Sequence, residues 1–150
     1  MRLLVTLDEA IELESKIRSC YEFLSKITQD GVAAELRELA HEEKSHINVL
    51  RTGRNFVIRT PDVFGQEAVS DAEIRLGIKA AADIEEGLKA QKLAYAQALR
   101  KIYDLEKKFE RVHMNTAVEF KDYSLKKLFE ALARADAEHR QRLERLMGEL

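Results

Sequence analysis

The four histidines of this chain each follow an acidic residue by three positions. In a helix, this spacing places the two side chains on the same face. A carboxylate beside an imidazole suits iron, manganese or zinc as a ligand pair. Such pairs are also routine on solvated helix surfaces, so the spacing alone does not establish a metal site. The pairs are Glu38/His41, Glu43/His46, Glu110/His113 and Asp136/His139.

The periodicity of the apolar residues separates these pairs. An apolar stripe with steps of three and four runs through residues 32–51, as expected for the buried face of a helix. Glu43 and His46 fall on this stripe, so we predict that they point into the core. The residues that leave the stripe, and are therefore predicted to face solvent, are Glu38, His41 and Glu42.

Three further stretches have the same kind of stripe, and each is interrupted by a carboxylate. Glu110 falls just off its stripe, whereas His113 falls on it. Every long helix therefore brings at least one acid to its inward face. The polar residues on the four stripes are Glu14, Tyr21, Glu43, His46, Glu106, His113, Asp136 and His139.

Four long helices are predicted to carry the stripes, over residues 7–28, 32–51, 95–119 and 124–147. Residues 52–70 hold the single proline and are predicted to form a long connection that crosses the domain. The capping-box sequence Ser70–Glu73 then opens a short extra helix. We predict a break after it, between Gly87 and Tyr95. The chain is thus predicted to be all-α, with two helical hairpins packed as an antiparallel four-helix bundle.

The six predicted donors lie at similar distances from the turns of their hairpins. The first turn is centred near Asp30 and the second near Lys121. At about 1.5 Å per residue, all six side chains fall within roughly 8 Å along the hairpin axes. Hairpins that pack in register would bring them to one level. The six are Glu14, Glu43, His46, Glu106, Asp136 and His139.

Four carboxylates in an apolar core cannot all remain charged and unpaired, because desolvation costs several kcal/mol for each. Two solutions exist. The carboxyl groups are protonated or hydrogen-bonded, or they bind cations. Two divalent metal ions would balance the four negative charges.

These residues resemble the ferritin-like di-iron carboxylate proteins, in particular the rubrerythrin-type domain. "LESKIRSCYEFL" followed by "LRELAHEEKSHINVL" resembles the first half of that domain. The spacings from Glu14 to Tyr21 and from Glu43 to His46 both match. "DLEKKFERVH" followed by "LFEALARADAEHRQRL" resembles the second half, so the likeness covers nearly the whole chain.

The resemblance implies a ferritin-like fold with a two-iron site, in which manganese or zinc are alternative metals. The ligands would be the six donors above, with bridging carboxylates from the two acid-x-x-His motifs. Tyr21 would hydrogen-bond a ligand carboxylate, and His113 stands where a second such tyrosine would be. Both are candidates for supplying protons. Peroxide or dioxygen would be the oxidant, and we expect a homodimer.

The sequence departs from the rubrerythrin pattern in two respects. Asp136 replaces the usual glutamate and shortens the reach by one methylene group. The rubredoxin domain is missing, and Cys20, the only cysteine, cannot form a cysteine metal site. Redox turnover would therefore require an external electron donor.

Three functions are compatible with these residues. The first is an oxidoreductase that reduces peroxide or dioxygen. The second is an iron carrier that oxidises and stores iron in an oligomer. The third is a structural or partner-binding bundle whose metal site has decayed, and the aspartate at position 136 is the feature that favours it.

Composition limits the remaining possibilities. The 150 residues suffice for one domain, residues 1–150, with a substantial core. The 25 basic and 27 acidic residues are mixed along the chain, so we do not expect nucleic acid as a partner. No apolar run approaches membrane-spanning length and the N-terminus does not resemble a signal peptide, so a cytoplasmic protein without a membrane partner is expected.

Overall fold

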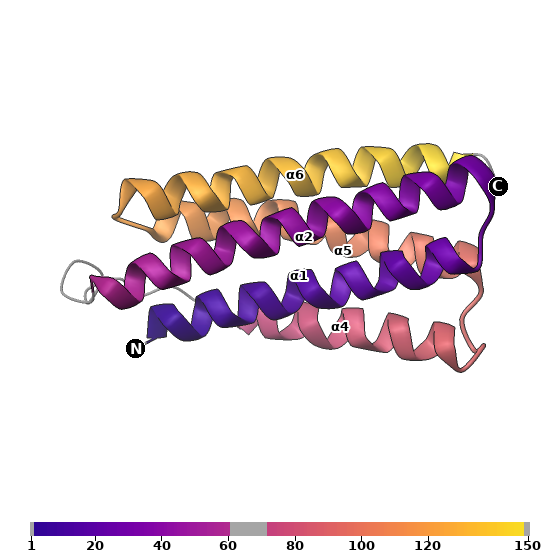
Figure 1. Cartoon of the computed structure of the whole chain (residues 1–150), viewed down its shortest axis with the longest axis horizontal. Helices are drawn as coiled ribbons and strands as arrows, with labels where there is room; N and C mark the ends of the chain where they lie inside the picture. The colour runs from indigo at the N-terminus through magenta and orange to yellow at the C-terminus, as the bar shows by residue number, and fades with distance from the viewer. Residues whose placement is uncertain (1, 61–71, 149–150) are drawn as a thin grey trace.

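The computed structural model describes residues 2–60 and 72–148, and these form a bundle of five helices (Figure 1). No β-strand occurs among the described residues. The prediction of an all-α bundle is thereby confirmed. The helices are α1 (Arg2–Lys26), α2 (Asp30–Arg59), α4 (Ala72–Lys89), α5 (Tyr95–Glu119) and α6 (Tyr123–Gly148).

Two helical hairpins make up most of the bundle, as predicted. Helices α1 and α2 run in opposite directions side by side, and so do α5 and α6 (Figure 1). Helix α4 packs against α1 and α5. It begins at the end of the bundle where α2 finishes and ends where α5 begins (Figure 1). Helix α4 therefore provides the crossing between the two hairpins.

The predicted connection over residues 52–70 is wrong in its first part, because α2 continues to Arg59. Thr52 and Gly53 weaken the helical pattern in the sequence, but packing overrides this local preference. Val57 is fully buried, and a Cβ atom at Gly53 would lie 3.4 Å from the Leu128 side chain. The start of the predicted capping box, at Ser70, lies outside the described residues.

The predicted extra helix is present as α4, which has 18 residues. Its inner face can approach its neighbours closely because it carries small residues. A Cβ atom at Gly77 would lie 2.3 Å from Cζ of Phe109, so only glycine fits there without a shift. The predicted break between Gly87 and Tyr95 is confirmed. It contains Gln91 in the left-handed region, with φ 58°.

The turn predicted near Asp30 is present between α1 and α2. Asp30 adopts the positive φ, at 55°, and Gly31 belongs to the first turn of α2. Aspartate tolerates this region better than most residues, because its short side chain can hydrogen-bond locally.

The apolar core consists of two clusters with a polar layer between them. The first cluster includes Leu36, Leu39 and Leu143, and the second includes Leu50 and Leu132. The predicted stripes run with steps of three and four through residues 3–24, 36–50, 99–120 and 125–146. Every residue on these stripes is buried except Leu128 and His46, which are partly exposed. On α2 and α6, the acid-x-x-His motifs lie along the chain between residues of the two clusters.

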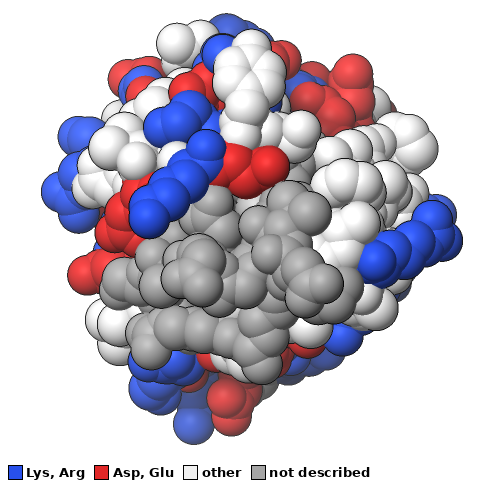
Figure 2. All heavy atoms as spheres, turned by 90° about the vertical axis from the view of Figure 1, so that its left-hand side faces the viewer, with Lys and Arg blue, Asp and Glu red and all other residues white. Residues whose placement is uncertain are grey.

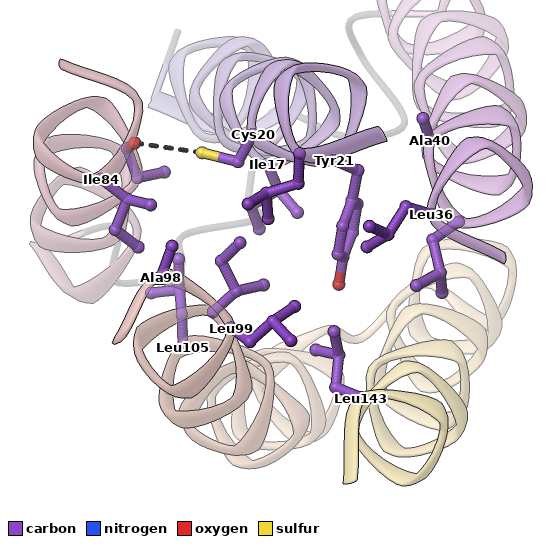
Figure 3. Close-up of a cluster of buried hydrophobic side chains, with 14 of the residues drawn as sticks. Ile17, Cys20, Tyr21, Leu36, Ala40, Ile84, Ala98, Leu99, Leu105 and Leu143 are labelled. Carbon is purple, nitrogen blue, oxygen red and sulfur yellow. Dashed lines mark hydrogen bonds between the residues drawn. The ribbon is translucent and has the colours of Figure 1, made fainter. Parts of the chain in front are cut away.

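Figure 3 shows part of the first cluster, viewed along the helices. Tyr21 extends from α1 into the middle of the bundle, with its hydroxyl oxygen directed away from its own helix (Figure 3). The Cys20 thiol donates a hydrogen bond of 3.3 Å to the carbonyl oxygen of Ala81 on α4. Burial raises the pKa of this thiol to about 12, so Cys20 is a packing residue rather than a reactive one.

The described surface carries both signs of charge. At the end of the molecule shown in Figure 2, basic and acidic side chains are interspersed among the other described residues. The expectation that nucleic acid is not a partner remains a prediction. Among the described residues, none of the helices combines the length and the apolar character needed to cross a bilayer.

Candidate metal centre

The structure brings all six predicted ligands, together with His113, into one cluster in the middle of the bundle. The side chains come from α1, α2, α5 and α6. They form three overlapping groups in which one donor atom from each residue lies within 4.8 Å of the others. The groups are Glu14/Glu43/His46, Glu43/Glu106/His139 and Glu14/His113/Asp136.

The cluster is almost completely closed to solvent. The exposed fractions of Glu14, Glu43, Glu106 and Asp136 are all between 0% and 2%. The two imidazoles of His113 and His139 are similarly buried. His46 is the exception, with 19% of its side chain exposed. Access to the cluster from solvent therefore lies on the side of His46.

His139 connects α6 to the carboxylates of two other helices. Its Nδ1 lies 3.0 Å from Oε1 of Glu43 and 3.5 Å from Oε1 of Glu106. The Tyr21 hydroxyl donates a hydrogen bond of 2.8 Å to the same Glu106 oxygen. The His46 ring stacks on that of His139, with centroids 5.6 Å apart and an interplanar angle of 20°. These contacts place one imidazole and one phenol around a carboxylate pair.

Asp136 faces a different neighbour from the rest of its motif. Its Oδ2 lies 2.5 Å from Nδ1 of His113, and the two residues share a group with Glu14. His139, three residues further along α6, belongs to the group of Glu43 and Glu106 instead. The acid and the histidine of this motif are thus divided between two positions, a separation that the sequence spacing does not reveal.

Many polar atoms of the cluster lack a hydrogen-bond partner within the described protein. A buried polar atom without a partner costs about 1–3 kcal/mol, and more when it is charged. A cluster of such atoms therefore requires protons, water or cations to complete it. The atoms are both carboxylate oxygens of Glu14 and of Glu43, Oε2 of Glu106, Nδ1 of His46, Nε2 of His113, and both ring nitrogens of His139.

Burial raises the pKa of three of the four carboxyl groups. Desolvation is the largest cause for Glu14, Glu43 and Asp136. Neighbouring carboxylates add to the shift, chiefly Glu43 for Glu14 and Glu106 for Asp136. In the protein alone, protons therefore neutralise much of the negative charge that the sequence places in the core.

Glu106 and His139 form the charged pair of the cluster. Burial acts to raise the pKa of Glu106, but the positive charge of the nearby His139 and the hydrogen bond from Tyr21 outweigh it, and the net pKa is lowered. For His139, burial acts to lower the pKa, but Glu106 and Glu43 outweigh it and raise the pKa to about 11. Burial lowers the pKa of His113 to about 4, so this imidazole is neutral near pH 7.

Glu42 and Arg142 lie beside the cluster, and the sequence reasoning missed both. Oε1 of Glu42 is 3.5 Å from Nε2 of His139, although Glu42 leaves the stripe of α2. Arg142 on α6 donates hydrogen bonds to Glu42 and, at 2.6 Å, to Glu35. The sequence offers one signal for this contact, because Arg142 lies three positions after His139 and therefore on the same face of its helix. A basic residue on that face requires an acid from a facing helix as its partner.

The cluster does not include Glu38, His41 or Glu110, which fall off their stripes. Glu38 and His41 are exposed, as predicted. The carboxylate of Glu110 accepts a hydrogen bond of 3.1 Å from Nε of Arg140 near the surface. Of the four acid-x-x-His pairs, only Glu43/His46 and Asp136/His139 bring both residues to the cluster. The position relative to the stripe, rather than the spacing, identifies them.

Comparison of the chain with protein-family models, curated proteins and solved structures gives no match. Inferences about function therefore rest on the chemistry of the cluster. A closed set of carboxylates and imidazoles can exchange protons for divalent cations without a change of net charge in the core.

Proposed function

We propose that this chain is a dinuclear metal protein of rubrerythrin type with a ferritin-like fold, and that it reduces peroxide or dioxygen with two iron ions. The ligands would be Glu14, Glu43, His46, Glu106, Asp136 and His139. The observation that carries the proposal is the set of buried, unpartnered carboxylate oxygens and imidazole nitrogens contributed by four helices.

The donor set fits the proposed ions. Carboxylate oxygens and imidazole nitrogens are the ligands that non-haem iron, manganese and zinc take in proteins. Four carboxylates balance two divalent ions, which removes the desolvation cost of unpaired charges. Apart from the pairing of Glu106 with His139, the carboxyl groups otherwise depend on protons, as their raised pKa values indicate.

Two ferrous ions, when bound, would provide the two electrons that convert hydrogen peroxide to water. The residues of the protein would position the oxidant and supply protons to it. The Tyr21 hydroxyl is within hydrogen-bond distance of Glu106 and can hold a proton there. Burial raises the pKa of Tyr21 well above its ordinary value, so the phenol is protonated at neutral pH. The electrons would come from a separate donor, since the chain has no cysteine metal site.

His46 would be the point of access for small oxidants and ions. It is the only one of the six proposed ligands whose side chain is appreciably exposed. The apolar clusters on both sides of the polar layer would exclude bulk water from the other donors. A site of this kind admits a molecule as small as peroxide and rejects larger substrates.

Metal content is the first test. Protein purified without chelators is expected to hold about two metal ions per chain by elemental analysis. The Glu43→Gln variant is expected to bind less metal, because Glu43 belongs to two of the three donor groups. Glu38→Gln is the matched control, since Glu38 also precedes a histidine by three residues but is exposed. Less than one ion per chain in the wild type, unchanged in Glu43→Gln, would favour a metal-free bundle.

The redox activity requires a separate experiment. Protein loaded anaerobically with ferrous iron is mixed with peroxide, and the iron absorbance is followed in time. Oxidation faster than that of free ferrous iron supports the oxidoreductase, and an equal rate contradicts it. Light scattering then distinguishes a dimer, which we expect of the enzyme, from the large closed shell of an iron-storage protein.

A further inference from the structure

The groups that the donor residues form in space differ from the acid-x-x-His motifs of the sequence. Two of the three groups are fully buried and share no residue, namely Glu43/Glu106/His139 and Glu14/His113/Asp136. Each contains two carboxylates and one imidazole. The third group takes its carboxylates from these two and adds the partly exposed His46.

We infer that His113 is a metal ligand, which binds one of the two ions through a ring nitrogen together with Glu14 and Asp136. This inference rests on the proposed function and adds a third imidazole to its ligand set. It gives His113 a direct role at the metal in place of the proton-supplying role expected from the sequence.

The contact between His113 and Asp136 is the first argument. Nδ1 of His113 lies 2.5 Å from Oδ2 of Asp136, and each of Glu14, His113 and Asp136 offers a donor atom within 4.8 Å of those of the other two. Aspartate at this position is one methylene shorter than glutamate. The imidazole of the facing helix α5 compensates, since it brings a further donor to the place where the short carboxylate ends.

The fixed position of the ring is the second argument. The His113 ring packs against Phe109 and Phe129, with centroid distances of 5.4 Å and 5.9 Å. Its exposed fraction is 1%, and Nε2 has no hydrogen-bond partner among the described residues. The imidazole thus lies in an apolar wall, and its polar contact within the described part of the chain is the one with Asp136. Donors held in this way need little rearrangement to bind an ion.

The distribution of charge is the third argument. If one ion is bound by Glu14, Asp136 and His113, and the other by Glu43, Glu106 and His139, each divalent ion meets two carboxylates. The negative and positive charges then balance within each position and not only over the whole cluster. No other division of the four carboxylates uses two separate and fully buried groups.

The competing interpretation is that His113 only orients Asp136, as outer hydrogen-bond partners of metal ligands do. Loss of metal affinity on mutation does not separate the two, because such partners also change affinity by about 10–100-fold. The decisive measurement is therefore a bond between the metal and the ring.

The experiment uses the whole protein loaded with NMR-active cadmium and carrying isotopically labelled histidine. A cadmium–nitrogen coupling is expected at three imidazoles, those of His46, His113 and His139, and none at the exposed His41. His113→Gln assigns the His113 signal, and circular dichroism checks that this variant folds. Chelator competition is expected to show one of the two ions bound about 10–100-fold more weakly in His113→Gln, with no change in His41→Gln.

The outcomes separate this inference from the proposed function. Coupling at His46 and His139 without coupling at His113 overturns the inference and leaves the dinuclear centre intact. Absence of coupling at every histidine, with no cadmium bound, overturns both. If His113→Gln fails to fold, the coupling in the wild-type protein still decides, because the three coupled signals are distinguished by His46→Gln and His139→Gln.

Discussion

The hydroxyl of Tyr21 on α1 donates a 2.8 Å hydrogen bond to the carboxylate of Glu106 on α5, 85 residues away in the sequence. Both side chains are completely buried. This bond joins the two hairpins at the level of the polar layer and, together with His139, it lowers the pKa of the Glu106 carboxyl group inside the core.

Replacement of Tyr21 by phenylalanine removes the donor and keeps the ring. Hydrogen bonds to charged groups contribute about 1.5–3 kcal/mol, so we expect Tyr21→Phe to lower the free energy of unfolding of the metal-free protein by about that amount. Urea unfolding monitored by circular dichroism measures the change. Tyr123→Phe serves as the control, because Tyr123 is 70% exposed and should change stability little. Equal effects of the two substitutions would show that the buried hydrogen bond contributes nothing.

The stability of the metal-free protein is expected to fall as the pH rises above about 6.5. Folding raises the pKa values of Glu14, Glu43 and Asp136, and that of His139 from 6.5 to about 11. The folded state therefore keeps protons that the unfolded chain has released, and each such group loses stability with rising pH. The opposite contribution of His113, whose pKa is lowered from 6.5 to about 4, is complete below this window.

The measurement is urea unfolding of chelator-treated protein at pH 6.5 and at pH 9. We expect a loss of at least about 2 kcal/mol over this interval. Metal-loaded protein should behave in the opposite way, because ions compete with protons for the same donors and bind more tightly as pH rises. A metal-free stability that is constant or increases with pH would contradict the buried-proton description of the cluster.

Arg142 is predicted to be one of the few charged residues whose removal strongly destabilises the fold. Its side chain is only 9% exposed and contacts Glu35 and Glu42, with Glu38 at 3.7 Å. Arg142→Met would leave these acids without their cation, at a cost of about 3 kcal/mol. Lys79→Met is the control, since Lys79 is 76% exposed and its pair with Asp83 contributes less than about 1 kcal/mol. Thermal unfolding of both variants tests the difference, and similar melting temperatures would refute it.

Two glycine substitutions should have opposite effects. A Cβ atom at Gly77 would collide with the Phe109 ring, whereas one at Gly31 would meet no atom within 4 Å. We expect Gly77→Ala to destabilise the protein by about 1–3 kcal/mol through overpacking. Gly31→Ala should stabilise it by up to about 1 kcal/mol, because alanine is the better helix former. Denaturant midpoints of the two variants give the comparison, and a destabilised Gly31→Ala would show that the start of α2 requires glycine.

The sequence was sufficient for the helices whose stripes keep regular steps of three and four. The steps of three and four from Leu3 to Leu24 and from Leu99 to Phe120 predicted buried faces that the structure confirms. The polar interruptions predicted the members of the cluster, because a charged residue on a buried stripe is rare unless it has a partner. Position on the stripe also rejected Glu38 and His41 correctly.

Features that depend on contacts between helices could not be predicted. The extension of α2 to Arg59 relies on packing of Val57 and on the close approach of Leu128 to Gly53. Glu42 was rejected for leaving the stripe, yet it reaches His139 from the flank of its helix. The pairing of Asp136 with His113 depends on the rotation of α5 relative to α6, which periodicity along either helix does not fix.

The polar layer between the two apolar clusters also affects how the molecule opens. In the metal-free protein, this layer is held largely by protons and by the pair of Glu106 with His139, so we expect the two ends of the bundle to fluctuate with little mutual dependence. Ions that bind residues of four helices at once would make the two ends open together. Amide hydrogen exchange would then change from two separate levels of protection to one when metal is bound. The metal centre would couple the opening of the two apolar clusters.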